Sequence, residues 1–174
     1  MTVGGYRLWL IPADRYVQIG TITRRWAADR TDIGVRSIPF LRSHLAQHGI
    51  FPQVDYASQR RFSSTLPSMT SSRIVGTLAD ERGDPEAGRV AATTHLQQPG
   101  AVVLSASFDP GWHASVDGRP QGALMVAPAL VATRVPAGTH TVVFQYSGFN
   151  GYPGLFALSG AVLVAFAVVD LRKR

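Results

Sequence analysis

The chain has 174 residues, a length that suits one domain or one domain with an appendage, and its 17 Lys and Arg against 11 Asp and Glu give a formal charge of +6. Hydrophobic residues make up 45% and charged residues 16%, below the usual charged share of about a quarter, so disorder is excluded and a large apolar region must be buried. The absence of cysteine excludes a disulfide framework, a cysteine-based zinc or iron–sulfur site and a thiol nucleophile.

Residues 1–87 are predicted to form the N-terminal part of the main domain, with strands and one short helix. Strands are expected at 6–11 and 16–22 because apolar residues recur there between turn-forming residues. Ser37 is predicted to cap a helix that begins near Pro39 and ends at Gly49. That helix would turn Phe40, Leu41 and Leu45 inward. Residues 62–72 are rich in Ser and Thr, and residues 80–88 are predicted to be an acidic loop.

Residues 88–147 alternate between strand and turn patterns. Six short strands are predicted, at 89–96, 101–108, 112–116, 124–127, 130–135 and 139–146. In the second of them Val102 and Leu104 would face a core, while Val103 and Ser105 would lie on the other face. The fold class predicted is mainly β, an antiparallel, jelly-roll-like β-sandwich.

Turn chemistry separates these strands. Gly111 stands at the second central position of an Asp-Pro-Gly turn, which predicts a type II turn, and Gly118 ends an Asp-Gly pair typical of a tight hairpin. The turn residues predicted to be structural are Asp109, Pro110, Gly111, Asp117, Gly118, Pro136 and Gly138.

The C-terminal segment is apolar on all sides. Residues 152–171 are predicted to form one transmembrane helix, because the run is about 20 residues long and is followed by a basic tail, 172–174. Arg172, Lys173 and Arg174 would lie in the cytoplasm by the positive-inside rule, which places the main domain outside it. Residues 1–20 show no secretory signal, so we expect the chain to be the C-terminal piece of a longer polytopic protein in the cell membrane. A buried helix is the competing interpretation.

Two spaced motifs carry a family resemblance. The first motif, at 109–118, is an aspartate followed by PGW-x-A-x-VDG. The second, at 135–146, is VPAG-x-H-x-V-x-F-x-Y, and the apolar run follows it. In this arrangement the chain resembles the C-terminal end of the YfhO-like bacterial membrane proteins, and residues 1–87 resemble the extracytoplasmic region of actinobacterial members more loosely. The resemblance implies a domain of a membrane glycosyltransferase that takes sugar from a polyprenyl-phosphate carrier. It also implies upstream transmembrane helices that this sequence does not contain.

No catalytic residue is predicted. Glycosyl transfer or hydrolysis needs two facing carboxylates, whereas Asp109 and Asp117 occupy turns where they would bond their own backbone. His44 and His48 have the spacing of a helical metal pair but no third ligand nearby, so neither a metal nor a cofactor is expected.

The aromatic residues indicate carbohydrate as a candidate ligand, because sugar rings stack on flat aromatic side chains. Trp112 could fill the core beside Phe108 and Phe144, or it could form a platform for sugar rings with Tyr146 or Trp26. His113 and His140 could meet across a sheet. The candidate ligand-binding residues are therefore Trp112, His113, His140 and Tyr146.

The function expected from the resemblance is a non-catalytic accessory domain of a glycosyltransferase-like protein that modifies envelope glycans or lipid-linked sugars. A carbohydrate-binding or envelope-interaction module and a purely structural cap are the alternatives. The expected partners are the lipid bilayer, the upstream part of the parent protein and an envelope glycan. Nucleic acid is not expected, because the basic residues are dispersed except for the last three.

Overall fold

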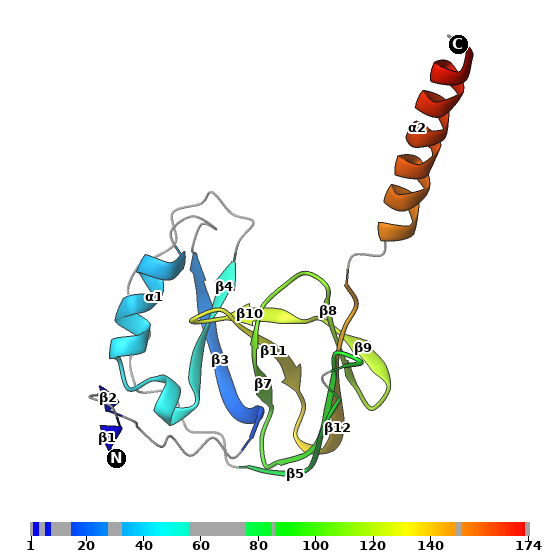
Figure 1. Ribbon diagram of the computed structural model, residues 1–174. Helices are drawn as coiled ribbons and strands as arrows, with labels where there is room; N and C mark the ends of the chain where they lie inside the picture. Colours follow the sequence, from blue (N-terminus) through cyan, green and yellow to red (C-terminus); the bar gives the residue numbers. More distant parts are fainter. Residues whose placement is uncertain are drawn as a thin grey trace.

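The computed structural model describes residues 2–3, 6–7, 15–27, 33–55, 76–84, 86–148 and 151–172 (Figure 1). Its elements in chain order are β1 (Thr2–Val3), β2 (Tyr6–Arg7), β3 (Val17–Ala27), α1 (Ile33–Arg42), the 3₁₀ helix η1 (Ala46–His48), β4 (Ile50–Asp55), β5 (Gly76–Asp84), β6 (Arg89–Leu96), β7 (Gly100–Ser107), β8 (Trp112–Val116), β9 (Arg119–Gln121), β10 (Leu124–Val126), β11 (Leu130–Val135), β12 (Gly138–Tyr146) and α2 (Tyr152–Arg172).

The fold is mainly β, as predicted, but it is not the predicted sandwich. Five strands close into a barrel in the order β10-β11-β7-β3-β4, and five more form a sheet in the order β5-β6-β12-β8-β9. The strands of this second sheet pair antiparallel, whereas β3 and β4 of the barrel pair in parallel. A parallel pair requires a crossover, and α1 with η1 lies between these two strands in the chain (Figure 1).

Two hydrophobic cores share β7. The barrel core contains Phe40, Leu45, Ile50, Phe51, Val54, Val103, Met125, Val126, Ala127 and Ala132. The inter-sheet core, between the barrel and the second sheet, contains Val17, Ala92, Leu96, Val102, Leu104, Ala114, Val116, Val131, Val135, Val142 and Phe144. The predicted outer face of Val103 is therefore wrong, because a strand that closes a barrel under a second sheet buries both of its faces.

The strands of residues 88–147 lie close to their predicted positions, but the acidic loop does not. β5 continues through Asp84 and pairs with β6, with a register shift between Ala79 and Arg82 and a positive φ of 51° at Asp80. Residues 80–84 are thus strand instead of loop. β5 lies at the edge of its sheet, where polar side chains can face water.

The first-half helix is present but shifted. α1 begins at Ile33, so Ser37 lies inside it, where its buried hydroxyl donates to the carbonyl of Pro128 at 2.9 Å instead of capping the helix. Phe40 is buried as predicted, but Leu41 is 64% exposed because the next position on a helix turns away from the core. Gly49, in the left-handed conformation, ends the helical segment where predicted.

The prediction of a transmembrane helix at 152–171 is wrong, and with it the predicted localisation. Among the residues that the structure describes, no helix is long and apolar enough to cross a membrane. α2, Tyr152–Arg172, forms and projects from the β-structure (Figure 1). The orientation assigned to Arg172, Lys173 and Arg174 loses its basis.

Candidate functional site

The structure brings two of the four candidate ligand residues together. The rings of Trp112 and Tyr146 lie 5.3 Å apart between centroids, at an interplanar angle of 54°. Trp112 is half-buried against the inter-sheet core, and its indole Nε1 donates to the carbonyl of Ser107 at 3.1 Å. Tyr146 is 38% exposed. The two tilted rings do not form one flat platform. The indole of Trp112 contacts the Tyr146 ring and is also fixed by its hydrogen bond to Ser107. The side chain of Trp26 lies outside the described residues.

The two candidate histidines do not meet. His113 on β8 pairs with Gln145 near the end of β12, whereas His140 lies near the start of β12 and pairs with Thr94 on β6. The interpretation that they face each other across the sheet is therefore wrong. His113 is exposed, while His140 takes the inward-facing parity of Val142 and is only partly exposed.

His140 instead contacts Asp117. Its Nδ1 lies 2.6 Å from Oδ2 of Asp117, and its Nε2 lies 3.1 Å from the carbonyl oxygen of Ala137. The other carboxylate oxygen of Asp117 accepts the backbone N–H of Thr141 at 2.9 Å. The hydrogen bond from His140 lowers the pKa of Asp117 below 3.8, and the hydrogen bond to Asp117 raises the pKa of His140 above 6.5.

The Asp-Pro-Gly turn forms, although not as type II. The Trp112 N–H donates to the carbonyl of Asp109 at 3.0 Å, and Oδ1 of Asp109 accepts the Gly111 N–H at 2.7 Å. Gly111 is not among the glycines with positive φ, so a type II turn is excluded. A Cβ on Gly111 would lie 2.5 Å from the Ser147 carbonyl oxygen. Glycine is needed here because the end of β12 approaches so closely.

The Asp-Gly hairpin forms as predicted. Asp117 and Gly118 have φ values of 51° and 74°, and they connect Val116 to Arg119 directly across the β8–β9 pair. Positive φ at both central residues is what a type I′ turn demands. Pro136 and Ala137 turn the chain into β12, where Gly138 has a φ of 119°.

His44 and His48 do not form a helical pair. His44 follows α1, and its Nδ1 lies 3.1 Å from Oε1 of Gln47, whereas His48 belongs to η1. Within the described part of the chain, no three His, Asp or Glu side chains are grouped closely enough to hold a metal ion. The Ser-rich segment 62–72 lies outside the described residues.

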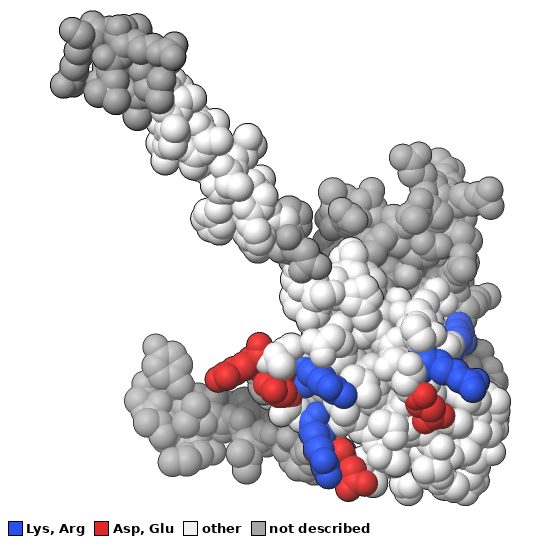
Figure 2. Space-filling view, turned by 90° about the vertical axis from the view of Figure 1, so that its right-hand side faces the viewer, with Lys and Arg blue, Asp and Glu red and all other residues white. Residues whose placement is uncertain are grey.

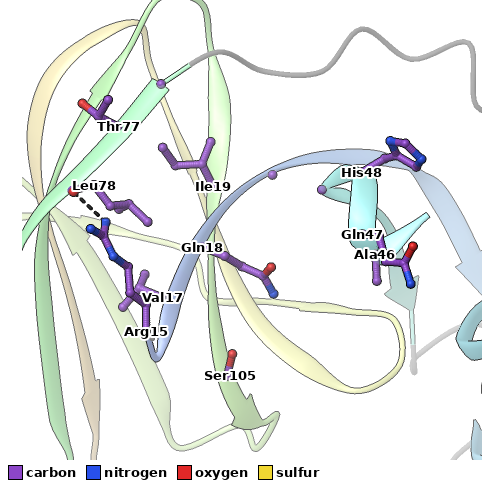
Figure 3. A pocket seen from close by; sticks show the side chains of 13 residues that line it. Arg15, Val17, Gln18, Ile19, Ala46, Gln47, His48, Thr77, Leu78 and Ser105 are labelled. Carbon is purple, nitrogen blue, oxygen red and sulfur yellow. Dashed lines mark hydrogen bonds between the residues drawn. The ribbon is translucent and has the colours of Figure 1, made fainter. Parts of the chain in front are cut away.

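A cleft with mostly polar walls is a feature that the sequence analysis missed. It has a volume of about 680 Å³ and lies where β3, η1 and β5 meet. Figure 3 shows the Gln18 side chain extending from β3 into the space between β5 and η1. The cleft is lined by Arg15, Val17, Gln18, Ile19, Gly20, Ala46, Gln47, His48, Gly49, Gly76, Thr77, Leu78 and Ser105.

Backbone and side-chain bonds fix the walls of this cleft. The Thr21 N–H donates to the carbonyl of Gly49 at 2.7 Å, which ties β3 to the end of η1. On the other side, Arg15 donates from its guanidinium to the carbonyl of Leu78 at 2.6 Å, as Figure 3 shows, which ties the start of β3 to β5. The cleft is thus part of the folded scaffold and needs no ligand to form it.

The chemistry of the lining is amide and hydroxyl. Gln18, Thr77 and Ser105 make no side-chain hydrogen bond to any other residue that the structure describes, so their donors and acceptors are available. Among the lining residues that the structure describes, Arg15 and His48 are titratable and none carries a carboxylate. The amide and hydroxyl groups can bind a hydroxyl-rich ligand.

Only part of this cleft carries a sequence signal. Gln18 interrupts the apolar residues Val17 and Ile19 of a predicted strand, which marks it as facing a different environment. The approach of β5 and η1 to that strand depends on pairings between residues far apart in the chain, which periodicity does not report.

The charged side chains on one face of the molecule are mixed in sign. Figure 2 shows Lys or Arg beside Asp or Glu over the β-structure on that face, with no large field of one sign among the described residues. A partner that approaches this face meets no uniform charge to steer it.

Comparison of the chain with protein-family models, with curated proteins and with solved structures finds no match.

Proposed function

We propose that this chain is a non-catalytic, carbohydrate-binding accessory domain that serves a YfhO-like, glycosyltransferase-like protein acting on cell-envelope glycans. The cleft between β3, η1 and β5 is the observation that carries the proposal. Its size suits a small ligand, since binding pockets typically enclose about 300–1,000 Å³.

The lining favours sugar over other small ligands. Side-chain amides and hydroxyls both donate and accept hydrogen bonds, as sugar hydroxyls do, and Gln18, Gln47 and Thr77 present such groups from three different elements. The described lining residues include no carboxylate, which favours binding over hydrolysis as the role of this cleft. The proposed role at the cell envelope rests on the two motifs that end at Gly118 and Tyr146, which resemble sequence motifs of YfhO-like proteins.

Isothermal titration with neutral oligosaccharides prepared from bacterial envelope galactan, mannan and peptidoglycan tests the proposal. Gln18→Ala should weaken binding of the recognised oligosaccharide by about 10-fold, because one lost hydrogen bond in a desolvated site costs roughly 1.4 kcal/mol. Gln98→Ala is the matched control, since Gln98 is exposed in the turn between β6 and β7. Absence of binding to all three preparations, or equal affinities of the two variants, contradicts the proposal.

A second assay addresses the absence of catalysis. The chain should neither release nor transfer sugar from those oligosaccharides or from a polyprenyl-phosphate sugar. Turnover that a single Asp or Glu substitution abolishes would show that an acid–base pair exists, and the domain would then be an enzyme.

A further inference from the structure

Asp117 and His140 join three segments at one corner of the second sheet. Asp117 lies in the β8–β9 hairpin, His140 lies near the start of β12, and Ala137 lies in the turn before that strand. The backbone adds a second link, because the Asp117 N–H donates to the carbonyl of Thr141 at 2.8 Å while the Thr141 N–H donates to Oδ1 of Asp117. Beyond the β8–β12 ladder, the turn of the hairpin is thus bound to β12 by two backbone donors and one side-chain pair.

The geometry favours a doubly protonated ring when Asp117 is ionised. Both nitrogens of His140 face oxygen atoms, a carboxylate oxygen at 2.6 Å and a carbonyl oxygen at 3.1 Å. A neutral imidazole has one N–H and can donate to only one of these acceptors, whereas the imidazolium donates to both. The arrangement therefore stabilises the His140 cation beside an ionised Asp117, and the His140 side chain is 18% exposed against 50% for Asp117.

The other charged groups near this corner do not replace either partner. Arg119, at the start of β9, acts on Asp117 through its positive charge and favours the carboxylate. His95, on the neighbouring strand β6, contacts the Thr139 hydroxyl at 2.8 Å and not the ring of His140. Thr94 of β6 donates to the backbone carbonyl of His140 at 3.4 Å, and its hydroxyl does not titrate. The corner is thus controlled by one carboxylate and one imidazole.

We propose that Asp117 and His140 form a pH-dependent clasp that closes when His140 is protonated and Asp117 is ionised and that loosens the Asp117–Gly118 turn and the 136–138 turn when His140 loses its proton. The 136–138 turn also contributes Pro136 to the lining of a second cleft of about 340 Å³. The clasp thus acts on a turn that borders this cleft.

The pH window follows from the direction of each pKa shift. The pKa of His140 is raised above 6.5, so its contribution is fully present below pH 6.5 and is lost as the pH rises through the folded-state value. The pKa of Asp117 is lowered below 3.8, so its contribution is present above pH 3.8 and is lost as the pH falls through the folded-state value. The clasp is closed between these limits.

Titration of the histidine rings of the full chain by NMR tests the clasp. The midpoint of His140 should lie above 6.5, and Asp117→Asn should bring it down to about 6.5. Asparagine suits the test because it tolerates the positive φ of this position and retains an oxygen for the Thr141 N–H. His113→Gln, on an exposed position of β8, should leave the midpoint of His140 unchanged.

A second readout distinguishes a clasp from a merely perturbed histidine. The backbone amide resonances of Gly118 and Ala137 should shift with the same midpoint as the His140 ring in the unmodified chain. They should lose that transition in Asp117→Asn and in His140→Gln. A His140 midpoint at or below 6.5, or amide transitions that persist in both variants, would overturn the proposal. Neither result depends on carbohydrate binding.

Discussion

Gly111 and Gly118 lie in neighbouring turns but are constrained in different ways. Gly118 has a φ of 74°, and a Cβ there would meet no atom within 4 Å, so backbone strain alone opposes a side chain. Gly111 has an ordinary φ, but a Cβ would lie 2.5 Å from a backbone oxygen of Ser147. A side chain at position 118 could be accommodated at the cost of backbone strain. A side chain at position 111 could be accommodated only if the end of β12 moved.

These constraints predict the effect of substitutions. Gly118→Val should lower the free energy of unfolding by about 1–3 kcal/mol, the cost of a β-branched residue in the left-handed region. Gly118→Asn should cost less, because asparagine accepts that conformation. Urea denaturation measures both. Equal losses for valine and asparagine would mean that positive φ is not what the position requires.

Trp112 is expected to contribute mainly to stability. Its ring is half-buried at the edge of the inter-sheet core, so Trp112→Ala should lower the free energy of unfolding by about 2–3 kcal/mol, less than the 3–5 kcal/mol of a fully buried ring. Trp112→Phe keeps the contact with Tyr146 and loses only the bond to Ser107, at about 1 kcal/mol. Unchanged thermal unfolding of Trp112→Ala, together with weaker glycan binding, would favour the platform interpretation instead.

At the scale of elements, β7 shows why the sandwich prediction failed. Its alternation predicts one buried and one outer face, yet Ala101, Val102, Val103 and Leu104 are all buried. Val103 enters the barrel core and Val102 the inter-sheet core. The pattern of a single strand cannot report a second layer, because that layer is formed by β3 and β4, whose pairing spans long stretches of chain.

Threonine substitution distinguishes the two folds. Val103→Thr and Val102→Thr should each lower the free energy of unfolding by about 1–3 kcal/mol, because each buries a hydroxyl among apolar side chains. In a sandwich, Val103 would lie outside and its substitution would change stability by less than about 0.5 kcal/mol. Ser107→Thr, at an exposed end of the same strand, is the control. A neutral effect at Val103 would contradict the closed barrel.

α2 should be dispensable for the fold of the rest. None of its described side chains belongs to either core, and those from Tyr152 to Phe166 are exposed. A chain that ends at Gly148 should therefore unfold at the same temperature as the full chain within about 2 °C, measured by circular dichroism. A clearly lower melting temperature would show that α2 packs on the β-structure in solution.

At the scale of the whole molecule, the sequence predicts local structure well and the candidate site poorly. The strands from Arg89 to Tyr146 follow from alternation and turn residues because both signals are local. The cleft depends on Gln18, Gln47 and Thr77 meeting from three elements, which only the closed barrel and its crossover bring together. Aromatic residues directed the sequence prediction to Trp112 instead, because an exposed amide has no distinctive pattern.

The apolar helix shows the same limit from the other side. Its helical conformation was predicted correctly from its apolar composition. The predicted membrane crossing was not, because no helix among the described residues is long and apolar enough to cross a membrane.

Mapping of a bound oligosaccharide by amide chemical-shift perturbation shows whether sugar binds in the cleft. Titration of the ¹⁵N-labelled chain with the oligosaccharide selected by calorimetry should shift the amides of residues 17–20, 46–49 and 76–78, which line the cleft from β3, η1 and β5. The amides of Trp112 and Tyr146 should stay within the spread of unaffected residues. Perturbations centred on Trp112 and Tyr146, with none in the cleft, would contradict the cleft as the carbohydrate site.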